Sequence, residues 1–191
     1  RAQKQTNSFI TQEKKFFNEF KKIYMGLMIK KNAEKESFFT SLYFSKLYEI
    51  IVNNGFMSII QDNKNRIIAI GIFLNGKESC HYHLSASINY KIPGINNLLI
   101  FNAAIFAKKN NLKILHLGGG NINDQNDKLF KFKDSMSTNK HVYNIGKRIN
   151  QQKLYKKIKS AWRKKYPILY NKYSKRLLCY HIDTEIIDTY I

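Results

Sequence analysis

The sequence predicts an α/β protein with a mixed central sheet and helices on both faces of that sheet. Three observations support this fold class. Two amphipathic helix patterns are followed by three short apolar stretches with turn residues between them, and a helix pattern separates the third apolar stretch from a fourth. Strand, helix and strand in that order make a crossover, so the fourth stretch should lie parallel to the third.

The two N-terminal helices are predicted from their periodicity. Apolar side chains recur every three or four residues from 16 to 28, lysines lie outside this stripe, and Thr11 with Gln12-Glu13 suits the start of the helix. The second pattern covers residues 36–52 and ends at Asn53-Asn54-Gly55. Its expected inward-facing residues are Phe39, Leu42, Tyr43, Leu47, Ile50 and Ile51.

Three strands are expected next, at residues 56–61, 66–74 and 78–88. The second and third are joined by Asn75-Gly76, the strongest short-range signal for a hairpin. These strands should therefore form an antiparallel meander.

The crossover helix is expected at residues 95–109, with Asn96 or Asn97 as its cap and with small alanines that allow close packing on the sheet. The parallel strand follows at residues 113–117. Beyond it we expect a helix at 127–137, a strand at 142–149 and a basic helix at 151–165, whereas residues 166–191 form a tyrosine-rich tail without a firm assignment.

Composition indicates a globular protein: 43% of the 191 residues are hydrophobic. No apolar run reaches the roughly 18 residues of a membrane helix, and the first residues lack an apolar signal-peptide core, so a cytoplasmic protein is expected. The two cysteines, Cys80 and Cys179, have no CxxC spacing, so neither a disulfide framework nor a zinc site is expected.

The net charge of +20 has two interpretations. The positive charge is mostly lysine and accompanies abundant asparagine and isoleucine, the mixture that an AT-rich genome gives to any protein. Alternatively, the surface meets anions such as tRNA, CoA phosphates, nucleotide-sugars or an acidic membrane face.

The segment from Ile114 to Ile149 joins an apolar strand, the triplet Gly118-Gly119-Gly120, a helix containing Phe132-Lys133 and a strand with Gly146-Lys147. It resembles the C-terminal signature of Fem-like (FemAB-type) transferases of the GNAT superfamily. Residues 20–33, 81–87 and 97–104 are also similar to motifs of this family, in the same order.

This resemblance implies a GNAT fold over residues 1–165, with residues 166–191 as a tail packing on it, and a chain that is the C-terminal half of a longer two-GNAT protein. It also implies an acyltransferase of cell-envelope synthesis. The donor would be acetyl-CoA or another acyl-CoA, or an aminoacyl-tRNA. The acceptor would be a sugar amine or a peptidoglycan precursor, at the inner face of the membrane.

The donor is expected between the two parallel strands, with its phosphates at the start of the crossover helix. Free N–H groups at Gly94, Asn96 and Asn97 favour an anion there. The glycine loop of ordinary acetyl-CoA enzymes is absent, which leaves aminoacyl-tRNA open. Gly118, Gly119 and Gly120 either make a tight turn or allow a substrate to approach closely. Phe132 completes the expected donor site.

Candidate catalytic residues are Lys133, His83 and His116. The resemblance places Lys133 at the donor end of the site, where it steadies negative charge; a solvated lysine is the alternative. His81 and His83 share one face of their strand and Tyr82 points to the other. His83 is either a proton acceptor or a structural histidine. His116 is expected to face the same cleft from the neighbouring strand.

Three further points concern a possible metal site, two basic residues and the function of the whole chain. His81 and His83 lack an apparent third ligand, so no metal is expected. Lys147 and Arg148 suit a solvated strand end or a ligand contact. The whole chain is either an acyltransferase or a non-catalytic polyanion-binding module that docks tRNA or a nucleotide-sugar.

Overall fold

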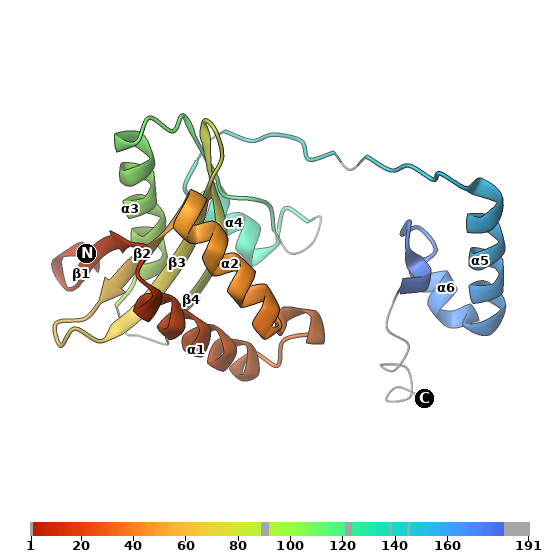
Figure 1. The fold of residues 1–191 in the computed structure, drawn as a ribbon, viewed down its shortest axis with the longest axis horizontal. Coiled ribbons are helices and arrows are strands. Elements are labelled where there is room, and N and C mark those ends of the chain that lie inside the picture. The colour runs from red at the N-terminus through yellow and green to blue at the C-terminus, as the bar shows by residue number, and fades with distance from the viewer. Residues whose placement is uncertain (1, 89–91, 121–123, 138, 145, 182–191) are drawn as a thin grey trace. The chain divides into compact units, whose positions relative to one another are not determined.

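The computed structural model describes residues 2–88, 92–120, 124–137, 139–144 and 146–181 (Figure 1). The chain divides into two compact units, Arg1–Asn139 and Lys140–Ile191. The division expected from the sequence, a domain over 1–165 and a tail over 166–191, stays a prediction, as does membership of a longer protein.

The first unit is built on a five-stranded sheet in the order β1-β2-β3-β4-β5. Its strands are β1 (Asn7–Thr11), β2 (Gly55–Gln61), β3 (Ile67–Asn75), β4 (Ser79–Ser87) and β5 (Ile114–His116). The first three pairings are antiparallel and β4 pairs with β5 in parallel, which confirms the predicted meander and crossover. The edge strand β1 was not predicted.

Helices cover both faces of this sheet, as predicted (Figure 1). On one face, α1 (Lys14–Lys30) and α2 (Ser41–Asn54) pack their buried aromatic and aliphatic side chains on Met57, Ile59, Ile70 and Ile72. On the other face, α3 (Ile95–Lys109) packs Leu98, Leu99 and Ala103 on the sheet. The mixed sheet between two helical layers confirms the predicted fold class.

The second helix differs from its prediction. It begins at Ser41 rather than near residue 36, because the side chain of Thr40 caps it by accepting a 3.2 Å hydrogen bond from the N–H of Tyr43; a single turn, η2 (Lys35–Ser37), precedes it. Leu42 and Ile50, predicted to face inward, are 68% and 46% exposed. The buried stripe is instead centred on Phe44, which lies against the rings of α1 and of Phe39.

The crossover helix α3 has the predicted bounds but a different cap. Gly94 precedes the helix with φ 84°, so neither Asn96 nor Asn97 is the N-cap. The chain turns into α3 through the left-handed region, which glycine enters without steric cost. Asn97 donates from Nδ2 to the Sδ of Met136, 3.4 Å away, beyond the short helix α4 (Lys128–Asp134).

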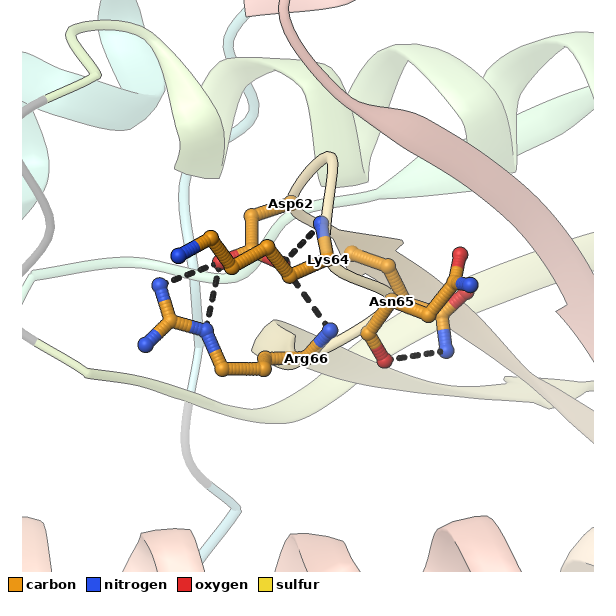
Figure 2. Close-up of polar contacts among 5 residues, drawn as sticks. Asp62, Lys64, Asn65 and Arg66 are labelled. Carbon is orange, nitrogen blue, oxygen red and sulfur yellow. Dashed lines mark hydrogen bonds and ion pairs between the residues drawn. The ribbon is translucent and has the colours of Figure 1, made fainter.

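The β2–β3 hairpin is held by a buried carboxylate (Figure 2). Asp62 is only 3% exposed. Its Oδ1 accepts hydrogen bonds of 2.9 Å from the backbone N–H groups of Lys64 and Arg66, and its Oδ2 accepts one of 2.7 Å from Arg66 Nε. The backbone N–H groups of Lys64 and Arg66 therefore find their acceptor within the hairpin itself.

The second unit contains α5 (Gln152–Lys165), as predicted, followed by α6 (Pro167–Tyr173) and the turn η3 (Cys179–His181). The strand predicted at 142–149 is wrong for the described part of that range, which excludes residue 145. Val142 and Tyr143 are 87% and 84% exposed, so they have no sheet to pack against. None of the helices in the described ranges has the length and apolar character required to cross a membrane.

Candidate active site

A β-bulge in β4 places His83. Ile72 of β3 pairs with Leu84 and the next residue, Phe73, pairs with Tyr82, so His83 is an additional residue without its own partner. Leu84 packs on the α1/α2 side, where His83 also bonds Tyr43 of α2, whereas Tyr82 stacks on Phe73 on the α3 side. A bulge bends its strand and re-aims a side chain. Here it directs two consecutive residues to the same face.

Pairing between β4 and β5 is short. It covers Ser79–His81 of β4 and Ile114–His116 of β5, which confirms that the two strands are parallel neighbours. Beyond His116 the chain turns through Gly118, whose φ is 74°, whereas β4 continues to Ser87. Pairing therefore ends at His81 and His116, just before the bulge.

Tyr43 and three histidines form a row across these strands. The Nδ1 atoms of His81 and His116 are 3.0 Å apart, so one ring donates its proton to the other. The ring centroids of His81 and His83 are 6.2 Å apart. His83 Nε2 lies 2.8 Å from the hydroxyl oxygen of Tyr43. His81, which was not among the predicted site residues, thus lies between His83 and His116. The only sequence signal for it was its position two residues before His83.

The environment favours the neutral forms of His81 and His83. Burial lowers the pKa of His83, and the neighbouring His81 lowers it further. The pKa of His81 is lowered by burial first, then by His116 and by Lys133. Desolvation and like charge both disfavour an imidazolium. A neutral imidazole has one ring nitrogen free to accept a proton, which is what a general base requires.

Lys133 lies over the glycine turn. Its Nζ donates a 2.7 Å hydrogen bond to the carbonyl oxygen of Gly119 and lies 5.9 Å from the centre of the Tyr82 ring. Burial lowers the pKa of Lys133, and Asp127 opposes this effect. The positive charge of Lys133 also lowers the pKa of His81.

The glycine triplet has separate structural roles. Gly118 makes the turn, and a Cβ there would lie 3.3 Å from Lys133 Nζ. A Cβ at Gly120 would lie 2.5 Å from Oδ1 of Asp127, the residue that caps α4 by accepting a hydrogen bond from the N–H of Phe130. A Cβ at Gly119 would meet nothing within 4 Å. The close approach at Gly120 is therefore made by a side chain of this protein.

A cleft of about 1000 Å³ opens at the start of α3. Four predicted donor-site residues line it: Gly94, Asn96, Asn97 and Phe132. Helix α1 adds Lys22 and Lys30, which the sequence analysis left outside the apolar stripe, and Lys31, the residue that follows the helix, adds a third cation. The cleft therefore combines helix N–H groups, lysines and one aromatic ring. The glycine triplet and the histidine row are not among the described residues that line it.

The described residues contain no group of three or more His, Cys, Asp or Glu side chains placed to hold a metal ion.

The sequence matches no protein-family model and no curated protein. The structure, in contrast, is similar to solved acetyltransferases. An aminoglycoside acetyltransferase from an uncultured soil metagenomic sample is 8% identical, with a TM-score of 0.55, over 76% of this chain and 99% of that chain. The chain has the GNAT fold.

Two further structures support this assignment. A ribosomal-protein-alanine N-acetyltransferase from Brucella melitensis biovar Abortus 2308 is 12% identical, with a TM-score of 0.53, over 76% of this chain and 99% of that chain. An acetyltransferase from Trypanosoma brucei is 8% identical, with a TM-score of 0.52, over 75% of this chain and 99% of that chain. The GNAT fold was the fold implied by the sequence resemblance.

Proposed function

We propose that this protein is a GNAT-type acyltransferase (EC 2.3 class) of the Fem-like branch. It transfers an acetyl or aminoacyl group to an amine or hydroxyl of a cell-wall precursor or surface-polysaccharide sugar. The observation that carries the proposal is the cleft at the start of α3, where predicted donor-site residues gather beside lysines of α1. The acetyltransferases of this fold support the reaction class, and the sequence resemblance supports the branch.

The cleft suits a donor that carries phosphates. The first N–H groups of α3 have no acceptor within the helix, and the dipole of its 15 residues favours an anion at that end. Lys30 and Lys31 add positive charge to the lining of the cleft, whereas the charge of Lys22 is offset by a 2.7 Å ion pair with Glu19. Phosphates of an acyl-CoA, or of the end of an aminoacyl-tRNA, have the required chemistry, and Phe132 offers an apolar surface to the remainder of the donor.

His83 and Lys133 supply the chemistry of transfer in this proposal. A neutral amine attacks the donor's carbonyl carbon, forming a C–N bond; the bond from that carbon to the leaving sulfur or oxygen then breaks. His83 accepts the proton that the amine loses, because its lowered pKa keeps it neutral. Lys133 stabilises negative charge that develops on the donor. His116 is the third catalytic residue in this proposal. It is hydrogen-bonded to His81, and the ring centre of His81 lies 6.2 Å from that of His83.

The test is acyl transfer by the purified protein, with acetyl-CoA and aminoacyl-tRNA as alternative donors. Lys133→Ala should reduce turnover by roughly 10²-fold, the scale of losing one electrostatic donor. The matched control is Lys131→Ala, which removes the same charge from the same helix; Lys131 Nζ donates to Asn126 Oδ1, 2.9 Å away, rather than to the glycine turn. Equal small losses in both variants would refute the role of Lys133.

Donor binding is tested separately by thermal shift. Acetyl-CoA should raise the thermal unfolding midpoint of the wild type, because ligand binding stabilises the native state by mass action. The midpoint should rise less in Lys30→Ala/Lys31→Ala, because this variant lacks two cations of the cleft. Lys108→Ala/Lys109→Ala, at the other end of α3, is the control.

A second candidate function, favoured by the net charge of +20, is non-catalytic docking of tRNA or a nucleotide-sugar. Salt-dependent tRNA binding without turnover on any donor would favour it over acyl transfer.

A further inference from the structure

Residues 140–181 of the second unit carry charge of one sign, and the acidic residues of this unit, Asp183, Glu185 and Asp188, all follow that range. Between residues 140 and 181 the sequence contains no aspartate or glutamate. Its charged residues are Lys140, Lys147, Arg148, Lys153, Lys156, Lys157, Lys159, Arg163, Lys164, Lys165, Lys172, Lys175 and Arg176. A stretch with one sign of charge repels itself, so it is stabilised by a polyanion. An AT-rich genome explains an excess of lysine, but not the complete absence of acidic residues over this range.

Helix α5 presents part of this charge as a row on one face. Lys153, Lys157 and Lys164 are exposed and follow each other at intervals of four and seven residues, so they align along the helix, with Lys156 beside them. Successive turns are about 5.4 Å apart, so the row offers about one cation per turn. Such a row can follow the charges of a phosphate backbone.

The opposite face of α5 is used within the unit. Trp162 is buried, and the hydroxyl of Tyr155 donates a 2.9 Å hydrogen bond to the carbonyl oxygen of Leu177. Lys159 points the same way, since its Nζ donates to the carbonyl oxygen of Ser174, 2.8 Å away. The face of α5 that carries Trp162 therefore packs on Tyr170 of α6 and on the segment that follows α6. The lysine row faces solvent.

Two arginines add guanidinium groups that lie over aromatic rings. Arg163 lies 5.2 Å from the ring centre of Tyr170, and Arg176 lies 4.9 Å from that of Tyr173. Both arginines are exposed. A guanidinium over a ring is held in place by the cation–π attraction, while its in-plane N–H groups stay available for phosphate oxygens.

We infer that the second unit is an RNA-docking surface, formed by the lysine row Lys153, Lys156, Lys157 and Lys164 together with Arg163 and Arg176. RNA is favoured over a membrane face because the four lysines and both guanidinium groups of this surface are exposed, whereas a membrane-bound amphipathic helix inserts a broad apolar side and the large apolar side chains that α5 exposes are two, Leu154 and Ile158, at 50% and 36%. Arginine and tyrosine planes also suit unpaired bases, which RNA exposes in loops and ends. The inference uses residues 140–181 alone, so it does not depend on acyl transfer by the first unit.

The test is fluorescence anisotropy of the full chain with a labelled RNA hairpin that has a single-stranded loop, over a series of salt concentrations. We expect log Kd to depend linearly on log salt. Replacing Lys153, Lys156, Lys157 and Lys164 together by alanine should reduce the magnitude of that slope by about 3, at roughly 0.7–0.9 per lost phosphate contact. The matched control replaces Lys14, Lys46, Lys108 and Lys109, exposed lysines of the first unit, and lowers the net charge equally.

A second set of variants separates charge from folding. The same four lysines of α5 changed to arginine keep the charge and should retain RNA binding, and far-ultraviolet circular dichroism should show that every variant keeps its helices. Equal reductions of the slope in the alanine variant and in the control would overturn the inference, because only bulk charge would then matter. It would also be overturned if the hairpin is not bound while vesicles of phosphatidylglycerol and phosphatidylcholine in equal parts are, since the surface would then be a membrane contact.

Discussion

Replacing Gly120 by alanine tests how the glycine turn holds the helix that carries Lys133. The added Cβ would lie 2.5 Å from Asp127 Oδ1 and 3.0 Å from Phe130 Cβ. The carboxylate must therefore move. When it moves, it loses the 2.7 Å hydrogen bond that it accepts from the N–H of Phe130, and α4 loses its N-cap.

The size of the effect follows from these contacts. Loss of an aspartate N-cap costs about 1 kcal/mol, within a range of roughly 0.5–2 kcal/mol. Helix α4 has 7 residues and none of them is buried, so little tertiary packing compensates. Since 1.4 kcal/mol corresponds to a factor of ten, a cost of about 1 kcal/mol should raise the open population of α4 roughly fivefold.

Hydrogen exchange with mass spectrometry on a peptide that covers residues 128–134 measures this opening directly. Gly119→Ala is the matched control, because its Cβ meets nothing within 4 Å and Gly119 is not among the positive-φ glycines. Exchange in the core peptides of β2 and β3 should be unchanged in both variants. The reasoning is refuted if α4 exchanges at the wild-type rate in Gly120→Ala, or equally fast in both variants.

Three further predictions concern the hairpin, the histidine row and the pH dependence of stability. Asp62→Ala should lower the free energy of unfolding by about 2–4 kcal/mol, because it leaves two part-buried N–H groups without the charged acceptor. Arg66→Met should cost less than Asp62→Ala, since the two backbone N–H donors still bind the buried carboxylate; equal losses in denaturant titrations would show that the ion pair dominates. His81→Asn should raise the pKa of His83, because it removes one of the two causes that lower it; an unchanged NMR titration of His83 would contradict this. In the wild type, the pKa of His81 and the pKa of His83 are both lower in the folded state than in the unfolded state. Their contribution to the free energy of unfolding is therefore complete above the unfolded pKa of about 6.5, and it is lost as the pH falls below that value.

Much of the first unit follows from local pattern. Helices α1 and α3 and strands β2, β3 and β4 lie within a few residues of their predicted bounds, because their apolar periods are regular and Asn75-Gly76 fixes one hairpin. The parallel position of β5 follows from chain order, since a strand that returns after a helix has few alternatives. The edge strand β1 lacks such a pattern: its residues are exposed or half-buried, and only pairing with β2 defines it.

The candidate site divides in the same way. Sequence alone selected Gly94, Asn96, Asn97 and Phe132, and the fold places them around one cleft. It did not select His81 or Lys30, because contacts made across strands or between helices leave no local pattern. Only the tertiary structure inserts His83 as a bulge, brings His81 to His116, and turns an apparently solvated face of α1 into a wall of the cleft. The physical reason is the distance along the chain: periodicity and turn chemistry act over a few residues, whereas these contacts join different elements of the fold, from the paired strands at the bulge to His81 and His116, which are 35 positions apart.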